Sequence, residues 1–146
     1  MIRRGLALVV GLAALGLSAC GGSTTSSTPA PAAKLVHVDG SHVPSVELTP
    51  LGAQRIGIQT TPVAAVAHRG GARTVIPYGA VVYEPNGKPV VFVNTGRFVY
   101  RLTPITIANI AGSRVYVSRG PAVGKRVVTV GAEELLGVQN GVGVEA

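Results

Sequence analysis

Residues 76–96 read IPYGAVVYEPNGKPVVFVNTG, which is the pattern of a β-hairpin. Two apolar runs rich in β-branched residues flank a turn that contains Pro85, Asn86 and Gly87, residue types that turns favour. We expect residues 80–84 to pair with residues 90–94. Such a hairpin occurs in enzymes, in binding modules and in scaffolds, so the sequence around it has to decide between these classes.

Further short strands are predicted on both sides of the hairpin. They are 58–66, 97–107, 114–118 and 125–131, with 68–75 as a loop that leads into a strand. Pro62 indicates an edge or a bulge, because proline cannot donate to a strand ladder. Strands that recur about every 10–12 residues with turns between them predict an all-β fold, a small antiparallel β-roll or barrel-like domain.

Strand 97–107 alternates between apolar and polar positions. Phe98, Tyr100 and Leu102 share one face, and Arg97 and Arg101 lie on the other. This alternation is typical of a strand with one buried and one solvated side.

Two short helical turns complete the expected domain. Thr49 followed by Pro50 predicts a helix over 51–56, with a hydroxyl cap at its start, and Gly57 can close it in the left-handed conformation. A second turn is predicted over 132–137, which begins with two glutamates and ends at a glycine.

The amino-terminal residues 1–19 have the pattern of a lipoprotein signal peptide. Two arginines precede an uncharged stretch of 15 residues, shorter than the roughly 20 residues of a membrane-spanning helix. The stretch ends in Leu17-Ser18-Ala19-Cys20, which resembles a bacterial lipobox cut just before the cysteine. Cys20 is therefore predicted to carry a covalent diacylglyceryl group, with palmitate among its acyl chains. The alternatives are an ordinary thiol after a type I cleavage, or a retained signal anchor.

Two acyl chains reach the threshold for stable membrane anchoring. Residues 20–33 comprise the lipidated cysteine and a run of Gly, Ser, Thr, Pro and Ala, a composition typical of a flexible linker. Residues 34–146 form the predicted β domain, and Cys20 is the sole cysteine, so no internal disulfide can form. We expect an extracytoplasmic protein on the cell membrane, or on the outer membrane if the cell has one.

The mature chain is basic. Loss of Arg3 and Arg4 from the 13 Lys and Arg leaves 11, against 6 acidic residues, a net charge of +5. Nucleic acid is disfavoured as a partner, because the cations are scattered singly, aromatic residues are few and the domain is exported. Anionic lipid headgroups suit a tethered protein better, and simple solubility explains the charge equally well.

No motif for catalysis is present. The chain lacks G-x-S-x-G, H-E-x-x-H and the phosphate-binding G-x-x-x-x-G-K, so we expect no enzyme and no cofactor besides the lipid. His37, Asp39 and His42 stand close together in HVDGSH, which makes a surface metal site conceivable, whereas two solvated histidines are the plainer interpretation.

The β domain resembles the membrane-proximal domain of periplasmic adaptors, the membrane fusion proteins of the HlyD and RND efflux family. Three stretches carry this resemblance: 46–63, VELTPLGAQRIGIQTTPV; 76–93, with its I-P-x-x-A-V start; and 104–137, whose G-x-x-x-G-x-x-V-V loop precedes a final Gly-x-x-x-Leu turn. The resemblance implies a β-roll that rests on an inner-membrane transporter. Full adaptors place a barrel, a lipoyl domain and a long α-hairpin between the first two stretches, where this chain has residues 64–74.

The leading hypothesis is a lipid-anchored domain that acts by contact, an accessory of an efflux or ABC-type transporter or of a full-length adaptor. Its candidate contact residues are cations, each of which could equally be an ordinary solvated charge: Arg97, Arg101, Arg119, Lys125 and Arg126. The alternative is a small-ligand or metal-binding envelope lipoprotein, and a third is a structural envelope domain without a specific ligand. The sequence leaves the oligomeric state open.

Overall fold

The computed structural model describes residues 30–37, 42–68 and 71–143, which form two antiparallel sheets with two short α-helices. The strands are β1 (Ala33–Val36), β2 (Ser45–Leu48), β3 (Gln59–Pro62), β4 (Ala64–His68), β5 (Gly71–Pro77), β6 (Val82–Tyr83), β7 (Pro89–Gly96), β8 (Val99–Pro104), β9 (Thr106–Ala111), β10 (Arg114–Arg119) and β11 (Arg126–Val130). The helices are α1 (Pro50–Ile56) and α2 (Ala132–Gln139), with a 3₁₀ turn, η1, at Tyr78–Ala80.

The larger sheet has the order β1-β2-β8-β7-β11-β3, with β6 paired to β7, and the smaller sheet has the order β4-β5-β10-β9. The predicted all-β antiparallel class with one or two short helices is confirmed. The two sheets are not closed into a barrel. The first strand begins at Ala33, a buried residue that the sequence placed at the end of the linker.

Strand β7 lies in the middle of the larger sheet and is buried on both faces. Val90 and Phe92 face a first core, beneath α1 and α2, and Val91 and Val93 face a second core, between the two sheets. A strand covered on both sides needs apolar residues at every position, which explains why the run PVVFV shows no alternation. The second strand of the predicted hairpin is therefore the central strand of the fold.

The chain passes from the larger to the smaller sheet at two single residues. Val63 separates β3 from β4, and Ile105 separates β8 from β9; each follows a proline and each is buried in the second core. The predicted strands 58–66 and 97–107 are therefore wrong as continuous strands, because each is divided between two sheets. Pro62 lies on an edge strand of the larger sheet, as predicted.

Two further predictions need correction. The hairpin is real but shorter, since only Val82 and Tyr83 pair with β7 and η1 takes the place of the expected start at residue 80. Residues 68–75 are not a loop: strand β5 starts at Gly71 and pairs with β4 as a hairpin.

Helix α1 agrees with its sequence signals. The backbone N–H of Gly52 donates to the Thr49 hydroxyl oxygen at 3.0 Å, Pro50 opens the helix, and Gly57 ends it at φ 71° in the left-handed region. The second helix extends two residues beyond the predicted turn, to Gln139, with Glu133 and Glu134 in its first turn.

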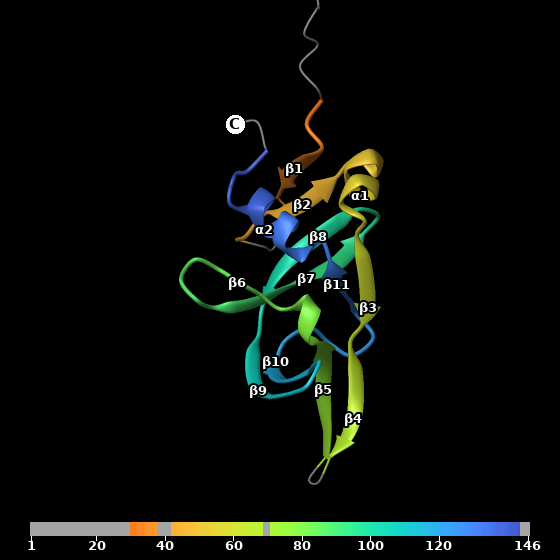
Figure 1. The fold of residues 1–146 in the computed structure, drawn as a ribbon, viewed down its shortest axis with the longest axis vertical. Helices are drawn as coiled ribbons and strands as arrows, with labels where there is room; N and C mark the ends of the chain where they lie inside the picture. Colours follow the sequence, from red (N-terminus) through yellow and green to blue (C-terminus); the bar gives the residue numbers. More distant parts are fainter. Residues whose placement is uncertain (1–29, 38–41, 69–70, 144–146) are drawn as a thin grey trace, which may run out of the picture.

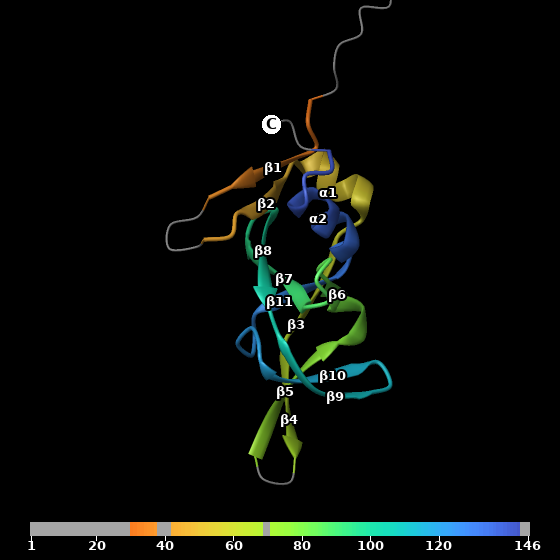
Figure 2. The ribbon, with the colours of Figure 1, turned by 90° about the vertical axis from the view of Figure 1, so that its left-hand side faces the viewer.

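The molecule is elongated, with unlike ends (Figure 1). The segment that leads into β1 enters at the end that carries the β1–β2 hairpin, α1 and α2, and the β4–β5 hairpin forms the opposite tip; Figure 2 shows the same arrangement from the side. We call these the tether end and the far end. Among the described residues, no helix is long and apolar enough to span a bilayer.

Substitution of Gly131 by alanine is expected to destabilise the fold by about 2–5 kcal/mol. Gly131 precedes α2 at φ 90°, where an L side chain costs roughly 1–2 kcal/mol, and a Cβ there would collide with Ile58 and Ile56, adding overpacking strain of roughly 1–3 kcal/mol. Urea unfolding followed by circular dichroism measures the loss. Gly124, at φ 87° with open space around it, is the matched control; an equal loss in both alanine variants would contradict the predicted collision.

Candidate partner-contact surface

A polar groove of about 360 Å³ opens where the end of β7, strand β8 and the loop before β11 meet. Arg101 and Lys125 are its charged groups, and no carboxylate lines it. Its walls are Val93, Asn94, Thr95, Arg101, Thr103, Pro121, Ala122 and Lys125. We call it the basic groove. Its volume lies within the range of ligand pockets, roughly 300–1,000 Å³.

Sheet register positions Arg101. Its Cα lies opposite that of Val93 on β7, and Val93 in turn lies opposite Val127 on β11. Residues opposite one another share a face, so the guanidinium group extends from the same face as the second core. It is exposed at the edge of that core, where solvent and a partner can reach it.

Backbone hydrogen bonds hold the loop that carries Lys125. The Val63 N–H donates to the Lys125 carbonyl oxygen at 2.7 Å, and the Gly124 N–H donates to the Val63 carbonyl oxygen at 2.9 Å. These two hydrogen bonds fix the loop to Val63, one of the two residues at which the chain passes between the sheets. This loop was singled out from the sequence for its charges, and the structure adds the reason for its fixed position.

The surroundings of the groove are cationic. No aspartate or glutamate occurs between Glu84 and Glu133, a span that contains seven lysines and arginines. Exposed charges interact over roughly 8 Å at physiological ionic strength, so Arg101 and Lys125 act on groups that enter the groove itself. Carboxylates and other anions suit these two side chains, and the Thr95 and Thr103 hydroxyl groups can add neutral hydrogen bonds.

The other candidate contact cations lie apart from this groove. Arg126 extends from the opposite face, where its Nε donates to the Thr60 hydroxyl oxygen at 2.8 Å and its Nη2 donates to the Thr60 carbonyl oxygen at 2.7 Å. It therefore joins β11 to β3. Arg119 is exposed at the end of β10, and Arg97 belongs to the tether end. The structure thus brings together two of the five predicted contact residues.

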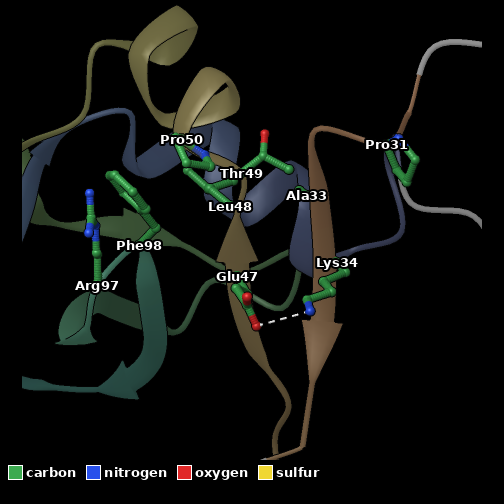
Figure 3. Close-up of a pocket in the computed structure, with 9 residues that line it drawn as sticks. All are labelled: Pro31, Ala33, Lys34, Glu47, Leu48, Thr49, Pro50, Arg97 and Phe98. Carbon is green, nitrogen blue, oxygen red and sulfur yellow. Dashed lines mark ion pairs between the residues drawn. The ribbon is translucent and has the colours of Figure 1, made fainter.

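A second groove, of about 560 Å³, lies at the tether end, and Figure 3 shows its lining. We call it the tether-end groove. Its residues come from the chain before β1, from β1 and β2, from the start of α1 and from the turn between β7 and β8: Pro31, Ala33, Lys34, Glu47, Leu48, Thr49, Pro50, Arg97 and Phe98. Lys34 and Glu47 form an ion pair at 3.3 Å across the β1–β2 hairpin (Figure 3).

Arg97 and Phe98 form the tight turn of the β7–β8 hairpin. The Arg97 guanidinium carbon lies 5.5 Å from the centre of the Phe98 ring, within the range of a cation–π contact. Phe98 has φ 61°, an unusual backbone conformation for a bulky residue. The sequence had placed both residues in a strand and gave no sign of this turn.

The structure describes two of the three candidate metal ligands. His37 and His42 are exposed, and Asp39 lies outside the described residues. Within the described part of the chain, no three His, Cys, Asp or Glu side chains come together in a way that could hold an ion.

The lipobox, Leu17, Ser18, Ala19 and Cys20, also lies outside the described residues. Of the described titratable groups, Tyr100 is in the first core, where burial raises the pKa of its phenol.

No protein-family model matches the chain, and no curated protein matches it. Among solved structures, the fold is similar to an NMR structure of the N-terminal metal-binding site and membrane proximal domain of SilB from Cupriavidus metallidurans CH34. The sequence identity is 17%, the TM-score is 0.43, and the match covers 64% of this chain and 58% of that one. The chain thus spans less than two thirds of the SilB chain, and the likeness concerns the fold alone.

Proposed function

We propose that this protein is a lipid-anchored extracytoplasmic β domain that acts by protein contact, as an accessory of an efflux or ABC-type membrane transporter. The observation that carries the proposal is the basic groove, which presents Arg101 and Lys125 with no carboxylate beside them. A site of this composition binds acidic groups of a partner, since complementary charges guide association and fix its register.

The motif resemblance supports the relation to adaptors. Its three stretches fold around both cores: 46–63 spans β2, α1 and β3; 76–93 contains η1, β6 and most of β7; and 104–137 runs from the end of β8 into α2. The intervening residues 64–74, where a full adaptor has its other domains, belong to the β4–β5 hairpin at the far end. A chain that has a hairpin there is suited to docking on a transporter, and lacks in this segment the parts that build a sealed conduit.

The anchor is the second part of the proposal. A diacylglyceryl group on Cys20 would hold the domain at the membrane surface without any other cofactor. The 12 residues that precede β1 after Cys20, 21–32, would allow an excursion of roughly 19 Å if they behave as a flexible coil. The groove would then stay within reach of the extracytoplasmic loops of a membrane protein.

Crosslinking in native membranes tests the partner. Chemical crosslinking of the lipidated protein in intact cells, followed by affinity purification and mass spectrometry, is expected to recover a transporter subunit or a full-length adaptor. Recovery of neither would overturn the proposed function. Identification of the neighbouring genes provides the list of transporter components to look for.

Charge reversal in the groove is expected to reduce that crosslinking at least tenfold. Arg101→Glu with Lys125→Glu puts two carboxylates where a partner's acidic groups should bind, and like charges brought together cost several kcal/mol. Both side chains are exposed, so the fold should persist, which circular dichroism can verify. Lys88→Glu with Arg114→Glu is the matched control: it makes the same change in net charge at exposed positions outside the groove. Equal losses from the two pairs would show that the groove has no special role.

A further inference from the structure

We propose that the tether end rests on the bilayer, with Leu51 facing the interface and with Arg55 and Arg97, the latter held over the Phe98 ring, bound to anionic phospholipid headgroups. This inference rests on the proposed lipid anchor and assigns the surface of the domain that meets the membrane. The partner is a phospholipid surface that carries negative charge.

The apolar part of this surface combines an exposed side chain with an open groove. Leu51, in the first turn of α1, is 53% exposed, and it directly follows Pro50, which lines the tether-end groove. The groove's apolar wall is completed by Pro31, Leu48 and Phe98. A single exposed leucine is ordinary. A leucine that adjoins an apolar groove containing an aromatic ring, however, forms a surface of aliphatic and aromatic groups that suits a membrane interface.

The turn at Arg97 and Phe98 supplies the second observation. Phe98 holds a left-handed backbone conformation at φ 61°, which glycine would adopt without cost. The residue that is present instead carries a ring, half-buried against the first core, and a guanidinium group lies over that ring. Strain of this kind at an exposed turn indicates a functional use of the side chain. An arginine held over an aromatic ring can bind a phosphate while its stem covers apolar surface.

Charge around the tether-end groove favours anions, because Glu133 and Glu134, the exposed carboxylates at the start of α2, line a different groove beside η1. Arg55 is exposed in the last turn of α1, and Arg97 is exposed in the β7–β8 turn. Lys34 is already paired with Glu47, the one carboxylate that lines the groove. Two arginines therefore remain to meet headgroup phosphates, and Arg suits phosphate because of its planar, multidentate guanidinium group.

The path of the chain agrees with this orientation. The described chain enters the domain beside the groove, at Pro31 (Figure 3), and ten residues separate Pro31 from Cys20. If it behaves as a flexible coil, a segment of that length has an average span of roughly 17 Å, which keeps the point where the chain enters the domain near the bilayer. The β4–β5 tip would consequently point away from the bilayer, and the basic groove would lie on the body of the domain, open to a protein partner.

Single-thiol labelling of the lipidated full chain in vesicles tests the inference. The thioether on Cys20 leaves an introduced cysteine as the chain's one free thiol. Leu51→Cys would carry the environment-sensitive fluorophore NBD at the tether end, and Val123→Cys, 54% exposed on the loop before β11, is the matched control. Vesicles contain phosphatidylcholine with or without phosphatidylglycerol, and brominated lipid serves as the quencher.

We expect the label at residue 51 to shift to the blue and to be quenched at least threefold more than the label at residue 123. Adding Arg55→Gln and Arg97→Gln to Leu51→Cys should reduce this quenching at least twofold in vesicles with phosphatidylglycerol, and leave it unchanged in pure phosphatidylcholine. Equal quenching at the two positions on an acylated chain would overturn the inference alone. Two free thiols per chain, together with failure to float with vesicles, would overturn the lipid anchor and the inference with it.

Discussion

Replacing Cys20 with serine is expected to abolish the incorporation of fatty acid into this protein. The thiolate of cysteine attacks the glyceryl carbon that bears the phosphate of a phospholipid, which forms the thioether, breaks the C–O bond and releases the phosphate headgroup. A thiol ionises far more readily than a serine hydroxyl, which stays protonated at neutral pH and is a far weaker nucleophile. Metabolic labelling with an alkyne fatty acid, followed by coupling to a fluorophore, should label the natural chain and leave Cys20→Ser blank.

Fatty-acid labelling is a sharper measurement than membrane fractionation for this variant. An uncleaved precursor keeps the apolar stretch of 15 residues and can remain in the membrane fraction for that reason. Ser23→Ala, three residues beyond the cysteine, is the matched control and should take up label as the natural chain does. A Cys20→Ser chain that is labelled to the natural level would rule out the lipid anchor at this residue.

Truncation of Phe92 is expected to cause the largest loss of stability among single core substitutions. Phe92 is 0% exposed, lies on the central strand β7 and contacts the first core beneath both helices. Removal of a buried aromatic ring to alanine costs about 3–5 kcal/mol, from lost burial and from the cavity that remains. Natural domains are stable by about 5–15 kcal/mol, so Phe92→Ala should lose a large part of the total.

Urea unfolding followed by circular dichroism measures this effect. Tyr83→Ala provides a control at another aromatic residue of the same hairpin, because Tyr83 is 48% exposed and should change the free energy of unfolding by no more than about 0.5 kcal/mol. A Phe92→Ala loss no larger than that of Tyr83→Ala would contradict the placement of Phe92 in the core.

Local signals in the sequence predicted the elements that depend on local chemistry. Helix α1 was predicted to within a residue, because Thr49, Pro50 and Gly57 each act within one turn. The antiparallel class followed from turn spacing, and the apolar, β-branched run 90–94 predicted a strand that lies within β7. In each case the residues that decide the structure are neighbours along the chain.

The transfers between sheets could not be predicted in this way. At Val63 and Ile105 the apolar pattern continues without interruption. The hydrophobic pattern alone therefore does not distinguish a strand that stays in its sheet from one that leaves it. The preceding prolines are the one sequence sign, and Pro62 had been interpreted as a mark of an edge or bulge. The decision between one strand and two depends on contacts with residues far away, such as Lys125.

The contact surface was only partly predictable, because it too depends on contacts between residues that are far apart in the sequence. Charge and turn position singled out Arg101 and Lys125, but their meeting in one groove depends on the pairing of β7 with β8 and on the bonds to Val63. The sequence equally offered Arg126, which the fold uses to join β11 to β3. The tether-end groove was not predicted, because its walls come from three stretches that are far apart in the sequence, 31–34, 47–50 and 97–98.

The passage of the chain through Val63 and Ile105 has a mechanical consequence. Each crossing gives the two sheets a covalent link one residue long, fixed by burial in the core between them, so the layers have little freedom to swing against one another. The domain would behave as a stiff spacer, and a load applied at one extremity would be transmitted to the other. A partner bound in the basic groove would then be held at a fixed distance from the membrane surface.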